Sequence, residues 1–143
     1  MIELRKLDSE HIQLMRKWRN QNREYFRDQK LITFKQQEGW FEKYLSNVEY
    51  WYFIIYVCEI PIGVIGFSII SKEEAHIESV ILGEKRFEKH GYTGEALEKV
   101  MSIFPFKVYS LKVLRDNKKA ISFYQKHGFS IKNDDGVCFL MSK

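Results

Sequence analysis

The chain has 143 residues, of which 45% are hydrophobic and 29% charged, with only 8 glycines and 2 prolines. This composition predicts a single globular domain over residues 1–143 and excludes disordered and collagen-like chains. The net charge of +4 favours an anionic ligand or partner, but the positive residues are scattered among acidic ones and form no basic block, so no nucleic-acid-binding arm is expected.

The cysteines and the N-terminal segment indicate the cellular compartment in which the protein is expected. Cys58 and Cys138 lie in apolar, strand-like segments without a CxxC pair, so both are expected to be reduced core residues. The first residues lack the apolar region of a secretion signal, and no apolar run approaches the roughly 20 residues of a membrane helix. A cytoplasmic protein without membrane contact is predicted.

The first third of the chain is rich in predicted helix. A short strand is expected at residues 2–7, followed by a helix over 12–20 that Asp8 or Ser9 can cap. In the segment 33–45 a threonine is followed three residues later by a glutamine. This capping-box pattern predicts the start of a second amphipathic helix.

From residue 50 onward the composition shifts to β-branched and aromatic residues. Strands are predicted at 51–58, 62–70 and 75–82, with a turn at 59–61, and three sequential strands imply an antiparallel meander. After Gly91 the pattern changes to a helix. Strand 107–114 and helix 118–126 come next, and two short strands follow around Ile131 and at 137–141. A helix between strands favours a parallel pair, so the expected fold is mixed α/β: the meander followed by a β-α-β-α unit with flanking helices.

Two segments carry candidate chemistry. The loop 83–94 precedes a helix and contains glycines beside Lys85, Arg86 and Lys89, which is typical of a phosphate-binding loop, although an ordinary strand-to-helix turn would have the same glycines. In the segment 116–129 a capping residue, an apolar helix face and a terminal glycine are all structural features, and by that interpretation Tyr124 only packs.

Together these segments resemble the GNAT superfamily of acyl-CoA-dependent N-acyltransferases, and the resemblance spans about residues 50–142. The late-helix motif of the family is matched by Asn117, Ala120, Ile121, Phe123, Tyr124, Gly128 and Phe129. Its CoA-binding loop and the start of the following helix are matched by the run from Gly91 to Leu97. Glu88 stands where the family has Gln or Arg, and Thr93 where it has a small residue. A carboxylate repels a pyrophosphate, so CoA binding requires Glu88 to point to solvent.

The resemblance implies acetyl-CoA as co-substrate. It places CoA binding at Val80, Ile81, Leu82, Glu88, Lys89, His90, Gly91, Tyr92, Thr93, Gly94, Asn117 and Tyr124. Backbone N–H groups near Val80 and Ile81 would polarise the thioester carbonyl, and Tyr124 would be the general acid that protonates the departing thiolate.

Acyl transfer to an amine also requires a proton acceptor, because a free alkylamine has a pKa of about 10.4. His76 and Glu78 occupy alternate positions of a predicted strand and thus one face, where either can take the proton directly or through water. The alternative is that both merely decorate a solvent-facing strand.

The N-terminal region is similar to the acceptor side of GNAT enzymes that acetylate nucleotide-linked amino sugars, and to the group that acts on ribosomal-protein N-termini. Arg19 and Arg23 are candidates for binding a diphosphate, and Trp18, Tyr25 and Trp40 for stacking on a base or sugar, although Trp18 and Trp40 at helical spacing are also typical of a core.

The predicted function is direct acetyl transfer from acetyl-CoA to a primary amine of a small molecule, with a nucleotide-linked amino sugar as first choice. Protein N-termini or small polyamines are the alternative acceptors, and a catalytically inactive CoA-binding module is the alternative from another class. The four histidines lack metal-ligand spacing, so no metal is expected. A monomer or a homodimer is compatible with the sequence, and no nucleic acid is expected as a partner.

Overall fold

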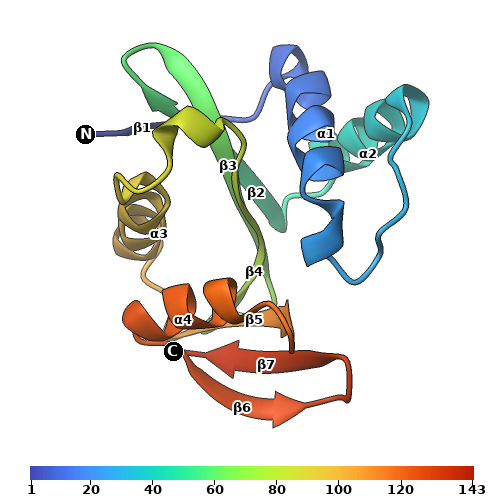
Figure 1. Cartoon of the computed structure of the whole chain (residues 1–143). Coiled ribbons are helices and arrows are strands. Elements are labelled where there is room, and N and C mark those ends of the chain that lie inside the picture. Colours follow the sequence, from blue (N-terminus) through green and yellow to red (C-terminus); the bar gives the residue numbers. More distant parts are fainter.

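Seven strands form one sheet in the order β1-β2-β3-β4-β5-β7-β6, and the computed structural model describes all residues from 1 to 143 (Figure 1). The strands are β1 (Glu3–Lys6), β2 (Tyr50–Val57), β3 (Ile60–Ile69), β4 (Glu74–Leu82), β5 (Val108–Leu114), β6 (Ser130–Asp134) and β7 (Cys138–Ser142). The helices are α1 (Ile12–Gln21), α2 (Phe34–Ser46), α3 (Tyr92–Ile103) and α4 (Lys118–Lys126), and short 3-10 turns lie at Ser9–His11, Arg23–Tyr25 and Lys85–Phe87.

The predicted mixed α/β fold is confirmed. Strands β2, β3 and β4 pair antiparallel as a meander, and β4 pairs in parallel with β5 through the crossover helix α3. Asp8 caps the 3-10 turn that leads into α1, and Thr33 with Gln36 forms the expected capping box at the start of α2.

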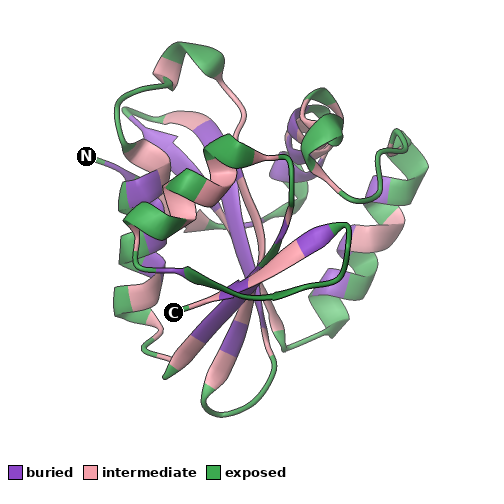
Figure 2. Ribbon diagram, turned by 60° about the horizontal axis from the view of Figure 1, so that its bottom comes forward, coloured by how far each residue is buried: buried purple, intermediate pink, exposed green.

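The helices lie in two layers, one on each face of the sheet (Figure 1). Helices α1 and α2 cover one face through a buried cluster that includes Trp18, Phe41 and Ile54. Helix α3 covers the other face through a cluster that includes Leu97 and Val100, and α4 packs against the border of that cluster. Figure 2 shows the buried residues concentrated in the central strands and on the inward faces of the helices. Because burying one such side chain contributes about 1.5–3 kcal/mol, these two clusters hold the sheet between its helices.

The turn between β2 and β3 differs from the expectation. Pro61, predicted to lie in the turn, pairs with Tyr56 inside β3, next to an irregularity in the register. Cys58 and Glu59 form the turn instead, with φ angles of 49° and 66°. Two successive left-handed residues give a tight hairpin turn that matches strand twist. The prediction that Cys58 is a core residue is therefore wrong, because the turn exposes it, whereas Cys138 is buried as expected.

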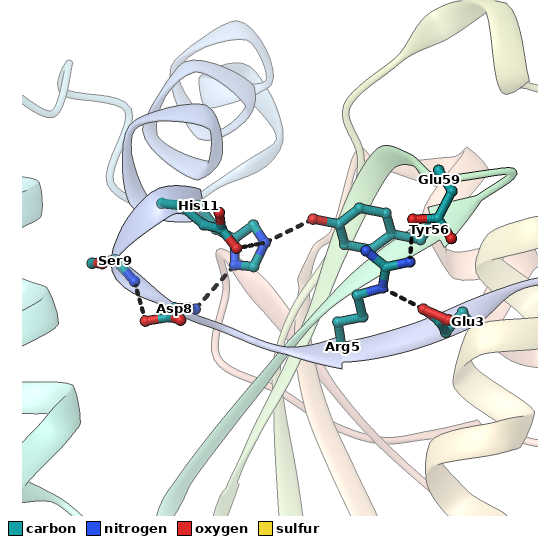
Figure 3. A network of polar contacts seen from close by, with 8 residues as sticks. Glu3, Arg5, Asp8, Ser9, His11, Tyr56 and Glu59 are labelled. Carbon is teal, nitrogen blue, oxygen red and sulfur yellow. Dashed lines mark hydrogen bonds and ion pairs between the residues drawn. The ribbon is translucent and has the colours of Figure 1, made fainter.

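A polar network ties β1 and the start of α1 to the sheet (Figure 3). His11 is buried, its Nδ1 accepts the backbone N–H of Asp8 at 3.0 Å, and its Nε2 lies 2.8 Å from the Tyr56 hydroxyl. Since Nδ1 accepts, a neutral His11 carries its proton on Nε2 and donates it to Tyr56. The Arg5 guanidinium covers the Tyr56 ring at 3.9 Å and pairs with Glu59 at 2.7 Å. This network stabilises the β1 edge of the sheet.

Candidate active site

Strands β4 and β5 separate part of the way along their length. Their parallel pairing runs only from Glu74 opposite Val108 to Ile77 opposite Leu111, although both strands continue for several residues. Beyond that point the facing backbone groups of the two strands have no strand partner. Backbone N–H groups inside a protein require an acceptor, so this opening suits a ligand that supplies one.

A β-bulge in β4 lies at the start of the opening. On β3, Phe67 pairs with Ile77 and Gly66 pairs with Ser79, so Glu78 is the extra residue between them. A bulge increases the local twist and re-aims the side chains beside it. The bulge thus turns the second half of β4 away from β5 and presents Glu78 at the mouth of the opening.

The alternation of hydrogen bonds along β4 decides which N–H groups face the opening. The Gly83 N–H donates to the Ile62 carbonyl of β3 at 2.7 Å. In an antiparallel ladder every second residue exchanges hydrogen bonds with the same neighbour, so Ile81 also directs its backbone groups toward β3. The N–H groups of Val80 and Leu82 consequently face β5, on the open side.

The segment after β4 leaves a row of backbone N–H groups free at the start of α3. The Glu88 N–H donates to the Lys85 carbonyl and the Glu95 N–H to the Gly91 carbonyl, but no protein acceptor takes the N–H groups of residues 89–94. Gly91 makes the bend with a φ of 75°, and a Cβ atom there would meet nothing within 4 Å. Free N–H groups at the start of a helix attract phosphate, so the N–H groups of residues 89–94 are able to bind an anionic phosphate group.

Charged side chains around this row favour an anion. Lys85, Arg86 and Lys89 are exposed beside it. Glu88 is exposed and forms no ion pair, which satisfies the condition that CoA binding places on its carboxylate. The Glu84 carboxylate instead accepts the indole N–H of Trp18 at 2.9 Å, so its charge is directed at α1.

Helices α3 and α4 approach each other closely beside the loop. A Cβ atom on Gly94 would lie 2.7 Å from Nε2 of His127, so only glycine fits there without a shift of that ring. The His127 Nδ1 in turn lies 2.8 Å from a carboxylate oxygen of Glu98. This contact sets the distance between the free N–H row on α3 and the side chains of α4.

Helix α4 carries Asn117 and Tyr124. The Asn117 side-chain oxygen caps the helix by accepting the Ala120 N–H at 3.3 Å. Tyr124 is half-buried, with its ring edge-on to Phe123 and Phe129, and its hydroxyl has no partner within the chain. Burial raises the pKa of the Tyr124 phenol well above its usual value, so the hydroxyl keeps its proton at physiological pH.

His76 and Glu78 lie together on the face covered by α1 and α2. Ile77, between them in the chain, points into the cluster beneath α3, while the His76 Nε2 lies 3.8 Å from a Glu78 carboxylate oxygen. The His76 Nδ1 lies 3.0 Å from the Ser110 hydroxyl on β5, and Ser110 donates to Glu74 at 3.1 Å. The His76 and Glu78 side chains are 23% and 27% exposed, so both are partly desolvated yet open to a small molecule.

Of the three aromatic residues predicted to contact the acceptor, Trp18 of α1 and Trp40 of α2 differ in exposure. Trp18 has no exposed surface, and a Cβ atom on Gly83 would lie only 2.1 Å from its ring. A side chain without exposed surface offers no face to a ligand, so the prediction that Trp18 stacks on the acceptor is corrected. Trp40 is half-buried, stacked on Tyr44 at 5.4 Å and edge-on to Tyr52 at 5.1 Å, and its role in binding stays a prediction.

The loop between α1 and α2 holds the other predicted acceptor residues. The Arg19 guanidinium lies 3.6 Å from the centre of the Phe26 ring and donates to the Asp28 carbonyl at 2.8 Å, so it already secures the loop. Burial lowers the pKa of Arg19 from its usual value. Arg23 and Tyr25 are exposed, and Arg23 forms no ion pair, so both remain available to a ligand.

Sequence reasoning missed two groups of this region. Ser110 and Glu74 contact His76 only because β4 and β5 pair, a tertiary contact that no local pattern reports. Gln37 of α2 is only 3% exposed, a burial that its position within the capping-box helix did not predict.

Separated parallel strands beside a row of free helix-start N–H groups suit the extended, phosphate-bearing thioester of an acyl-CoA-dependent transferase. The sequence places the chain in this class. The family model described as an acetyltransferase (GNAT) domain matches residues 2–130, and the chain belongs to this family.

Individual relatives agree with the family. Acetyltransferase PseH of Campylobacter jejuni is 30% identical over 94% of this chain and 88% of its own length. The solved structure of C. jejuni N-acetyltransferase PseH in complex with acetyl coenzyme A has a TM-score of 0.77 at 22% identity and covers 100% of this chain and 98% of that one. The PaiA N-acetyltransferase from Thermoplasma acidophilum, solved with coenzyme A, has a TM-score of 0.76 at 25% identity, with coverages of 100% and 98%.

The expected family is therefore confirmed: the chain is a GNAT acetyltransferase. No group of three or more His, Cys, Asp or Glu side chains lies together as a set of metal ligands. None of the helices is long and apolar enough to cross a membrane.

Proposed function

We propose that this enzyme transfers the acetyl group directly to the primary amine of a small molecule, and that the acceptor is a nucleotide-linked amino sugar. The observation that carries the direct route is the opening between β4 and β5. It lies between the N–H row of residues 89–94 and Tyr124 on one side and the pair of His76 and Glu78 on the other. A donor and an acceptor entering from opposite faces meet there.

Acetyl-CoA supplies an activated acetyl thioester when bound. In the proposed mechanism the N–H row of residues 89–94 holds the pyrophosphate, and the Val80 N–H polarises the thioester carbonyl. The amine nitrogen bonds to the carbonyl carbon while the carbon–sulfur bond breaks. His76 accepts one proton from the amine, and Tyr124 gives one proton to the departing sulfur.

The raised pKa of Tyr124 is compatible with this role. A phenol with a pKa far above that of a thiol is a weak donor in water. The departing thiolate, however, would form against the same apolar side chains, Phe123 and Phe129, where its own charge is poorly solvated. Desolvation therefore raises the proton affinity of the sulfur as well and keeps the transfer feasible.

The acceptor assignment is supported by the loop between α1 and α2. Arg23 is exposed without an ion-pair partner, and a guanidinium fork matches the oxygens of a diphosphate. Tyr25, 50% exposed, offers an aromatic face two residues away. Polyamines and protein N-termini carry no diphosphate and would leave Arg23 unused.

A thiol-release assay with a panel of amines tests the proposal. Nucleotide-linked amino sugars should give a higher kcat/KM than free amino sugars, polyamines or peptides, and Arg23→Ala should raise KM only for the nucleotide-linked acceptor. Lys35→Ala, which removes another exposed positive charge from this region, is the control. A peptide or polyamine preferred by the wild-type enzyme overturns the acceptor assignment. Binding of acetyl-CoA without turnover of any amine would identify an inactive CoA-binding module.

Tyr124→Phe tests the general acid. Loss of a general acid lowers kcat by about 10²- to 10⁴-fold, with little change in the Kd of acetyl-CoA. Tyr109→Phe is the matched control, since burial raises the pKa of Tyr109 to about 12 but its hydroxyl donates to the Phe104 carbonyl. An unchanged kcat in Tyr124→Phe removes Tyr124 from the mechanism. A monomeric or homodimeric state and a cytoplasmic location stay predictions.

A further inference from the structure

We infer that Ser110 and Glu74 are positioning residues for His76. They hold its imidazole in the tautomer that carries the proton on Nδ1, and so leave Nε2 free to accept the proton of the attacking amine. This inference rests on the proposed role of His76 and extends the site to a residue of β5. It assigns no contact with substrate to either Ser110 or Glu74.

The direction of the hydrogen bonds follows from counting protons. A carboxylate only accepts, so the single hydroxyl proton of Ser110 goes to Glu74, 3.1 Å away. The Ser110 oxygen is then left as an acceptor for His76, whose Nδ1 lies 3.0 Å away. A neutral histidine has one N–H group, so a proton on Nδ1 leaves the lone pair on Nε2.

The surroundings make this arrangement rigid. Ser110 is only 6% exposed, and the parallel register places it directly opposite His76. On the other side of His76, Ser68 of β3 is paired with it in register and 7% exposed, but Ser68 forms no hydrogen bond to the ring. One of the two flanking serines is thus bonded to the imidazole and the other is not.

The hydrogen bonds that join Glu74, Ser110 and His76 also keep the His76 ring in place after it takes a proton. The imidazolium would have the Glu78 carboxylate 3.8 Å from Nε2 and the Ser110 oxygen, backed by Glu74, at Nδ1. A positive ring between these groups is stabilised on both sides. Without a partner at Nδ1 the ring can turn about its side-chain bonds and carry the proton on either nitrogen.

Imidazole nitrogen NMR tests the tautomer without any need for activity. In two-bond ¹H–¹⁵N spectra of the ¹⁵N-labelled protein, recorded where the ring is neutral, His76 should show the Nδ1–H pattern, with the signals assigned by their loss in His76→Gln. Ser110→Ala and Glu74→Ala should abolish that pattern. Ser68→Ala and Ser110→Thr, which retains the hydroxyl, should preserve it. A wild-type Nε2–H pattern, or an unchanged Nδ1–H pattern in Ser110→Ala, overturns the inference.

The kinetic consequence is measured on the same variants. Ser110→Ala and Glu74→Ala should lower kcat by at least about tenfold and leave the KM for acetyl-CoA unchanged. The loss should not exceed the roughly 10²- to 10⁴-fold that a general base contributes. Ser110→Thr should restore kcat, and Ser68→Ala should not change it. A changed tautomer with an unchanged kcat also overturns the inference. A wild-type protein inactive toward every amine would instead refute the proposed function, while the NMR result would still decide the tautomer.

Discussion

The Gly91→Ala substitution probes the CoA loop with a single methyl group. Gly91 has a φ of 75°, a conformation that costs an alanine about 1–2 kcal/mol relative to glycine. The new Cβ atom would meet no protein atom within 4 Å, so no steric clash adds to this cost. The variant should therefore fold, with a free energy of unfolding lowered by about 1–2 kcal/mol.

The same methyl group should have a larger effect on acetyl-CoA. It projects from the bend that carries the free N–H groups of residues 89–94, into space where the protein has no atoms. Loss of one hydrogen bond to a charged group costs about 1.5–3 kcal/mol. At about 1.4 kcal/mol per tenfold change, the Kd of acetyl-CoA should rise by about ten- to a hundredfold.

Gly136→Ala is the matched control. Gly136 lies in the turn between β6 and β7, has a φ of 90°, and a Cβ atom added there would likewise meet nothing within 4 Å. Urea unfolding should show a similar loss of stability in both variants, and calorimetric titration should show weakened acetyl-CoA binding only in Gly91→Ala. Wild-type affinity in Gly91→Ala would refute the assignment of the N–H row to the pyrophosphate. An equal loss of affinity in Gly136→Ala would show that the effect is one of general strain.

Three further predictions concern helix α2, the His11 network and the two cysteines. Gly39→Ala, inside α2 with nothing within 4 Å, should raise the free energy of unfolding by about 0.5–1 kcal/mol in a urea titration, and a loss would contradict the helix propensity argument. His11→Phe leaves the Asp8 N–H and the Tyr56 hydroxyl without their partner, so urea unfolding should show a loss of about 1–3 kcal/mol. The double variant Cys58→Ser and Cys138→Ser should retain turnover in the thiol-release assay, and a folded but inactive double variant would refute direct transfer.

Local signals in the sequence were reliable where neighbours in the chain form the contact. The capping box at Thr33 and the αL glycine at Gly128, with a φ of 94°, depend on residues within a few positions of each other. The turn between β2 and β3 was predicted at residues 59–61 rather than at Cys58 and Glu59, because neither of these two residues favours the left-handed conformation that the hairpin imposes on them. Pro61 suggested a turn at residues 59–61, but it lies in β3.

The candidate site also combines features that local sequence signals indicate with features that depend on tertiary packing. Tyr124 and the loop around Gly91 were predicted from contiguous motifs, and the position of His76 and Glu78 on one face followed from strand alternation. The burial of Trp18 and the bulge at Glu78 depend on how α1 and β3 pack against β4, which no stretch of chain encodes alone.

By itself, the sequence determined the fold class and the family and indicated candidate residues for binding and proton transfer, because periodicity, caps and motifs are properties of chain neighbours. Only the tertiary structure decided which of these residues meet. The register between β4 and β5 places Ser110 against His76, and the end of that pairing opens the space between the two strands. Contacts between strands 34 residues apart along the chain arise from packing of the whole sheet, and they determine the direction in which the His76 proton points.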